Sequence, residues 1–120
     1  MTNKAAVSLS TGLEDPERVT VALLVAVGAA ESGRPTVMFL TKEAVRMALG
    51  GNAVGVACDG CPSIASLVER FEASGGTLMV CPICFNAKQL DSTALVGNAE
   101  LAGTVQLWEW IGDGATTFSY

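Results

Sequence analysis

Short apolar runs alternate along this chain with longer segments of helical periodicity. Residues 36–40 (TVMFL) and 77–80 (TLMV) are continuous apolar runs. Such runs are typical of strands that are buried on both faces of a parallel sheet. Residues 4–10 and 115–120 are expected to form a first and a last strand. The pattern therefore predicts a sheet whose strands are widely spaced in the sequence.

Helices are predicted between these strands. Asp15-Pro16 marks a helix start, because proline suits the first helical position, and this helix runs to about Ser32. Residues 63–74 are the clearest helix, since their apolar residues recur at i, i+3, i+4 and i+7. Shorter helices are expected at 42–49 and 104–111 and in the segment that begins at Cys81. Strands that alternate with helices indicate βαβ units and a parallel sheet.

The first helix contains the longest apolar run, from Val19 to Ala30. A membrane span needs about 20 apolar residues, and this run of 12 is bracketed by Arg18 and Glu31. We therefore expect a cytoplasmic protein with no membrane partner. A helix that is apolar almost all round is buried on more than one side, which in a chain this small indicates a subunit interface.

The predicted helix at 104–111 carries two tryptophans. Residues two apart on a helix do not share a face. Val105, Trp108 and Ile111 fall roughly on one side, so Trp108 is expected in the core and Trp110 nearer the surface or at an interface.

Composition narrows the class of protein. The length of 120 residues predicts a single domain, residues 1–120, and half of them are hydrophobic. The net charge of −5 and the scattered basic residues argue against nucleic-acid binding. The chain has no histidine, which excludes histidine-activated nucleophiles and histidine-ligated metals. Any chemistry must therefore use thiols, carboxylates or backbone amides.

The four cysteines form two pairs with the same C-x-x-C spacing, Cys58 with Cys61 and Cys81 with Cys84. Cys81 directly follows the predicted strand 77–80, and sites in open parallel sheets form at the carboxyl ends of strands. Cys81 also precedes a proline and a predicted helix. A helix N-terminus and the C-x-x-C spacing both favour a thiolate. The sequence therefore predicts a reactive cysteine here.

Several roles for the cysteines are consistent with the sequence. The 19 residues between the pairs match a zinc-ribbon template, which would make Cys58, Cys61, Cys81 and Cys84 the ligands of a structural zinc ion. A disulfide, or burial as small apolar side chains, are further alternatives. A persulfide carrier needs one accessible reactive thiol, with a second cysteine as an optional resolving partner.

The chain resembles the DsrE/DsrF-like (YchN-like) family over nearly its whole length. The resemblance rests on the order of the elements and above all on VCPICFNAKQL, residues 80–90. The family has here a strand that ends in cysteine, often C-x-x-C, followed by Ala, a basic residue, Gly and an aliphatic residue. The matching residues are Cys81, Cys84, Ala87, Lys88 and Leu90, while Gln89 stands where the family usually has glycine.

This resemblance implies a flavodoxin-like three-layer α/β sandwich, with a mainly parallel sheet of about five strands and helices on both faces. It also implies homotrimers or hexamers. For the sulfur-relay branch of the family it implies a persulfide-carrying cysteine, which by register is Cys81, with Cys84 as the alternative or the resolving partner. Sulfur donor and acceptor proteins would then be its partners.

Our leading hypothesis is thiol or persulfide chemistry at Cys81 and Cys84, without a cofactor. A non-catalytic oligomeric module, stabilised by a four-cysteine zinc site or a disulfide, is the first alternative. An oligomer that binds a small ligand between its subunits is the second.

Overall fold

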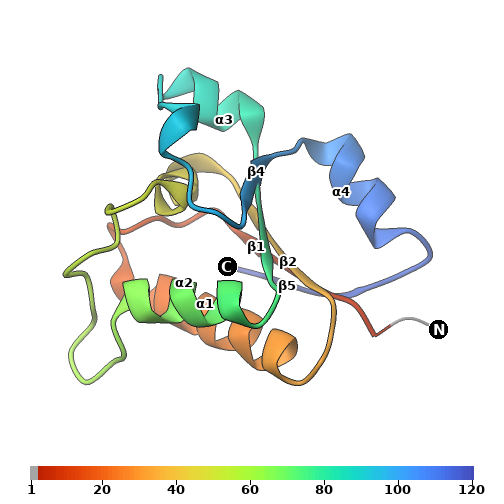
Figure 1. Ribbon diagram of the computed structural model, residues 1–120, viewed down its shortest axis with the longest axis horizontal. Coiled ribbons are helices and arrows are strands. Elements are labelled where there is room, and N and C mark those ends of the chain that lie inside the picture. The colour runs from red at the N-terminus through yellow and green to blue at the C-terminus, as the bar shows by residue number, and fades with distance from the viewer. Residues whose placement is uncertain (1–2) are drawn as a thin grey trace.

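The computed structural model describes residues 3–120 and contains a five-stranded, fully parallel sheet (Figure 1). The strand order is β4-β3-β2-β1-β5. The strands are β1 (Ala5–Leu9), β2 (Thr36–Leu40), β3 (Thr77–Val80), β4 (Ala99–Leu101) and β5 (Thr116–Ser119). The predicted α/β architecture with a parallel five-stranded sheet is confirmed.

Helices cover both faces of this sheet. Figure 1 shows α1 (Pro16–Glu31) and α2 (Ile64–Ala73) together on one side and α4 (Thr104–Ile111) on the other. The short helix α3 (Pro82–Ala87) follows β3 directly. The described residues also form two 3-10 helices, which are η1 (Lys42–Ala48) and η2 (Ser92–Ala94). In the part of the chain that the structure describes, no helix is both long and apolar enough to cross a membrane.

The alternation of side chains along the strands produces two cores. Val7 pairs with Met38, and Met38 with Leu78, and all three are buried under α1 and α2. The intervening residues point to the opposite face, where Val37, Phe39 and Met79 are buried beneath α4. Burial on both faces explains why β2 and β3 are continuous apolar runs.

Several elements begin and end where the sequence predicts. Strands β2 and β3 match the predicted ranges 36–40 and 77–80, and the predicted helix at 63–74 is α2. Asp15 caps α1 as its sequence position suggests, since its carboxylate accepts a hydrogen bond from the Arg18 amide. The three-residue strand β4 and the 3-10 helix η2 were not predicted, because neither is long enough to show a periodic pattern.

The prediction for the two tryptophans is wrong. Trp108 is 70% exposed, whereas Trp110 is half-buried and packs with Leu107 against the core on that face of the sheet. Helix α4 has apolar residues on both its inner and outer sides, so hydrophobicity alone does not say which side faces the sheet.

Candidate functional site

Cys81 lies at the carboxyl end of β3, between the strand and α3. Its amide donates a 3.0 Å hydrogen bond to the carbonyl of Leu40, the last residue of β2. Its own carbonyl accepts a 3.0 Å hydrogen bond from the amide of Phe85, and Pro82 occupies the first turn of α3. Cys81 is thus the N-cap residue of α3, where the sequence placed it.

Cys81 and Cys84 are both free thiols and both half-buried. They pack against different parts of the interior. Cys81 contacts the core on the α4 side of the sheet, where Ala102 lies, whereas Cys84 contacts the core that α1 and α2 cover. The two thiols therefore flank the start of one helix and have different surroundings.

The start of α4 adjoins the turn at Cys81. The amide of Ala102 donates a 3.0 Å hydrogen bond to the carbonyl of Val80, which extends the pairing of β3 and β4 to the edge of the sheet. Gly103, the N-cap residue of α4, lies so close that a β-carbon built on it would be 3.9 Å from Cδ of Pro82. This contact could not be predicted from the sequence, because it depends on strand β4, which was not predicted.

The end of α3 is a tight turn formed around Gln89. Leu90 donates its amide hydrogen to the Phe85 carbonyl, and Gln89 donates to the Asn86 carbonyl. This is the Schellman pattern that usually places glycine at the residue after the C-cap. Gln89 adopts the left-handed conformation that this pattern requires, with φ of 56°. A tight turn therefore forms at Gln89 although glycine is absent.

An ion pair between Lys88 and Glu43 connects the end of α3 to η1. Nζ of Lys88 lies 3.7 Å from Oε1 of Glu43, and Nε of Arg46 donates a 2.7 Å hydrogen bond to Oε2 of the same carboxylate. The hydrogen bond from Arg46 is the largest cause that holds the pKa of Glu43 below its ordinary value, and the positive charges of Arg46 and Lys88 act in the same direction. The sequence pattern did not single out Glu43, and its i, i+3 spacing to Arg46 is the signal that could have found this ion pair.

The other cysteine pair lies elsewhere and is closed. Cys58 and Cys61 form a disulfide in the loop between η1 and α2. Among residues 3–120 no group of three or more cysteine or carboxylate side chains is arranged to hold a metal ion. The structure thus does not bring Cys58, Cys61, Cys81 and Cys84 together into the alternative zinc site. It contains instead the disulfide that the same alternative allowed.

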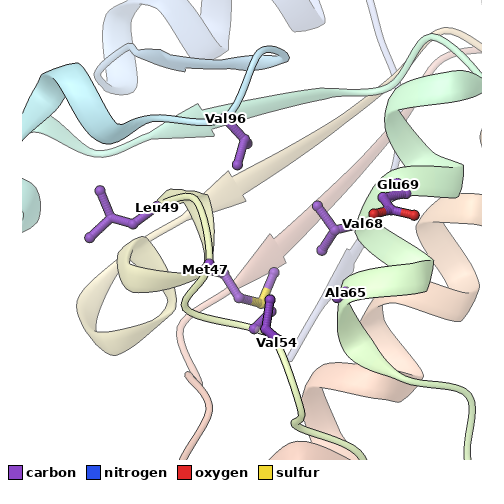
Figure 2. A pocket seen from close by; sticks show the side chains of 9 residues that line it. Met47, Leu49, Val54, Ala65, Val68, Glu69 and Val96 are labelled. Atoms are coloured by element: carbon purple, nitrogen blue, oxygen red, sulfur yellow. The ribbon is translucent and has the colours of Figure 1, made fainter.

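Neither free thiol lines the small apolar hollow that Figure 2 shows. It measures about 130 Å³, and Figure 2 shows Val68 of α2 and Val96 pointing into it from different segments. Ligand pockets usually measure about 300–1,000 Å³. The hollow is too small for such a ligand, and among residues 3–120 Glu69 is the one charged residue that lines it. The lining residues are Met47, Leu49, Gly51, Ala53, Val54, Ala65, Val68, Glu69 and Val96.

Comparison with known proteins places this fold and motif in a family. The model of the DsrE/DsrF-like family matches residues 3–120. The chain belongs to the DsrE/DsrF-like family. This DsrE-like membership supports a function of the sulfur-relay type in general terms. None of the curated proteins that were compared with the chain matches it.

Solved structures share the DsrE-like fold at low sequence identity. The ychN protein from E. coli superposes with a TM-score of 0.80 at 20% identity, with all of both chains covered. MTH1491, a protein of unknown function from Methanobacterium thermoautotrophicum, gives 0.69 at 9% identity, with 98% of this chain and 99% of that chain covered. BT1422, a conserved protein of unknown function from Bacteroides thetaiotaomicron, gives 0.67 at 16% identity, with 98% and 95% covered. These similarities establish the fold.

Proposed function

We propose that this protein carries sulfur as a persulfide on Cys81, with Cys84 as the second thiol of the site. The observation that carries the proposal is the state of the two cysteine pairs. Cys81 and Cys84 are free and half-buried at the carboxyl edge of the sheet, whereas Cys58 and Cys61 are joined to each other. Membership of the DsrE/DsrF-like family, which supports sulfur-relay function in general terms, favours a role of this kind for the free thiols.

Loading of Cys81 requires no external oxidant. The Cys81 thiolate attacks the outer sulfur of a donor persulfide, a new S–S bond forms, and the donor's own S–S bond breaks. The donor leaves as a thiolate, so the oxidation level that enters on the transferred sulfur is kept in the Cys81 persulfide. An acceptor thiolate then removes that outer sulfur by the same exchange and leaves Cys81 as a thiolate again.

Cys84 provides a second way to remove the outer sulfur from the Cys81 persulfide. Its thiolate attacks the inner sulfur of the Cys81 persulfide, a Cys81–Cys84 disulfide forms, and hydrosulfide leaves. The spacing of this pair is the same as that of Cys58 and Cys61, which are joined with a Cα–Cα distance of 5.2 Å. An external thiol reductant is needed to restore the two free thiols after this step.

Sulfur loading of the purified protein, with Cys58 and Cys61 still joined, tests the proposal. The native chain, incubated with glutathione persulfide without oxygen, is expected to gain one sulfur atom that a thiol reductant removes, as intact-protein mass spectrometry reads directly. Cys81→Ser should abolish the adduct, and Cys84→Ser should retain it for longer than the native chain does. The matched control is the Cys58→Ser, Cys61→Ser double variant, which should load normally. Undiminished loading of Cys81→Ser would disprove the assignment.

The proposal includes a cytoplasmic location, because glutathione and thioredoxin keep exchange-active thiols reduced there. Disulfides are rare in that compartment and are usually transient when they occur. The Cys58–Cys61 disulfide is therefore expected to be reversible in the cell, and its redox state is not part of the carrier step at Cys81.

A further inference from the structure

The outer side of α4 carries exposed apolar residues, and within residues 3–120 nothing covers them. Val105 is 65% exposed and Trp108 is 70% exposed, whereas Leu107 and Trp110 pack inward on the sheet. A helix that is apolar on both sides is normally covered on both. A large exposed tryptophan beside another apolar residue is typical of an interaction site.

This surface continues towards the free thiol. The start of α4 at Gly103 adjoins Pro82, and the next residue, Ile83, is 81% exposed. Cys81 packs on the same core as the inner residues of α4. We call Ile83, Val105 and Trp108 the α4 surface. A molecule seated on it would lie beside the turn that holds Cys81.

The charge around the α4 surface is negative. After Lys88 the chain contains no lysine or arginine, but it contains four acidic residues. Glu109 is exposed one helical turn from Val105, and Glu100 and Asp113 are exposed on β4 and after α4. None of these three forms an ion pair with a basic residue within residues 3–120. The acidic residues are Asp91, Glu100, Glu109 and Asp113.

Lys4 lies near α4, but its ammonium group is already engaged. Nζ of Lys4 donates a 2.7 Å hydrogen bond to the Trp110 carbonyl and lies 5.4 Å from the centre of the Trp110 ring. It therefore occupies the C-terminal end of α4, beside the residue that packs inward. The outer side at Val105, Trp108 and Glu109 keeps its negative charge.

We propose that the α4 surface docks a partner protein whose own apolar patch is surrounded by lysine and arginine, and which exchanges sulfur with Cys81. The proposal rests on the proposed function of Cys81. A second copy that met this surface with its own α4 would fit poorly, because it would bring Glu109 and its neighbours against identical carboxylates. Like charges placed opposite each other suppress an association, whereas opposite charges accelerate it.

Two synthetic peptide persulfides test the proposal. Both contain one tryptophan and one leucine beside a central persulfidated cysteine. The lysine peptide has lysines on either side of this segment, and the glutamate peptide has glutamates there. At low salt the lysine peptide is expected to load the full-length chain at least about tenfold faster than the glutamate peptide. Added salt should reduce this advantage, because it screens exposed charges. Glutathione persulfide serves as the donor that is too small to use the α4 surface.

Substitutions on α4 test whether the faster loading by the lysine peptide depends on the α4 surface. Trp108→Ala and Glu109→Lys should each remove most of the lysine peptide's advantage and leave loading by glutathione persulfide unchanged. Glu69→Lys on α2 is the matched charge control and should change neither rate. Both altered positions on α4 are exposed, so the variants are expected to fold normally.

The possible outcomes separate the two proposals. Equal rates for the two peptides, with normal loading from glutathione persulfide, would overturn the docking proposal and leave the carrier function intact. Failure of every donor to load Cys81 would overturn both. Dissociation of a homo-oligomer by Trp108→Ala in analytical ultracentrifugation would show that a second copy covers the α4 surface, and would also overturn the docking proposal.

Discussion

The Lys88 ammonium lies 3.7 Å from the Glu43 carboxylate, which joins the end of α3 to the 3-10 helix that follows β2. Lys88 belongs to the segment that begins with the C-P-x-C motif. Glu43 also accepts a hydrogen bond from Arg46 of η1. The segment that carries the two free thiols is thereby held against the neighbouring strand end by side chains as well as by the backbone.

This link predicts a pH dependence of stability. The hydrogen bond from Arg46, followed by the positive charges of Arg46 and Lys88, lowers the pKa of Glu43 in the folded protein below its ordinary value of 4.5. A carboxyl group with a lowered pKa stabilises the fold fully above its unfolded pKa and stops doing so as the pH falls through its folded pKa. The contribution from Glu43 should therefore be present at neutral pH and disappear below pH 4.5.

Urea unfolding of the native chain and of Glu43→Gln checks this prediction. The variant should be slightly less stable at neutral pH, since these groups are exposed and solvent screens them. The difference should vanish in strong acid. Glu69→Gln on α2 is the control, because Glu69 forms no ion pair within residues 3–120, and it should not reproduce the deficit of Glu43→Gln at neutral pH. A deficit of Glu43→Gln that persists in strong acid would contradict the ion-pair explanation.

The disulfide predicts unequal reactivity of the four cysteines. Native, unreduced protein should present two titratable thiols, Cys81 and Cys84, and unfolded, reduced protein should present four. Peptide mapping after alkylation should find Cys58 joined to Cys61. Four reactive thiols in unreduced protein would show that the pair is open.

The same disulfide closes a very short loop, so its effect on stability is limited. By the chain-entropy relation a loop of about four residues is stabilised by about 2 kcal/mol. The Cys58→Ser, Cys61→Ser double variant should therefore lose about 2 kcal/mol or less in urea unfolding. A much larger loss would mean that these side chains have a packing role beyond their covalent bond.

The left-handed conformation of Gln89 predicts that glycine at this position would stabilise the fold. Its φ of 56° lies in the left-handed region, which costs a residue other than glycine about 1 kcal/mol. Gln89→Gly should raise the free energy of unfolding by about that amount, as chemical denaturation will measure. Ala87→Gly, two residues earlier and still within α3, should instead lower it by about 0.5–1 kcal/mol. Similar effects of the two substitutions would contradict the turn geometry described here.

Self-association stays a prediction, and the structure suggests where to test it. Val21 and Leu24 are partly exposed on α1, and Phe118 is partly exposed on the edge strand β5. Arg18 lies near Val21 beside acidic residues, so the charge on this side is mixed. If the chain forms a trimer or hexamer through this side, Leu24→Glu should reduce the mass in analytical ultracentrifugation to that of a monomer, and Val105→Glu on α4 should not. An unchanged mass for Leu24→Glu would exclude α1 as the interface.

The sequence by itself determined the class of fold and the position of Cys81. Continuous apolar runs at 36–40 and 77–80 are specific enough to define buried parallel strands, and a helix with one apolar stripe is equally clear at 63–74. Because Cys81 follows a strand directly, its place at the carboxyl edge of the sheet followed from connectivity alone. The choice of Cys81 and Cys84 as the functional thiols remains a prediction from the motif.

Only the tertiary structure decided how the remaining groups are placed. Strand β4 has three residues, and its pairing with β3 brings Gly103 against Pro82 and thus α4 beside the thiol. The two cysteine pairs have the same spacing, yet Cys58 and Cys61 are joined whereas Cys81 and Cys84 are free. Trp108 and Trp110 are chemically alike, and the packing of α4 on the sheet determines which is exposed. Local patterns specify elements through periodicity, whereas contacts between distant segments depend on how the whole chain packs.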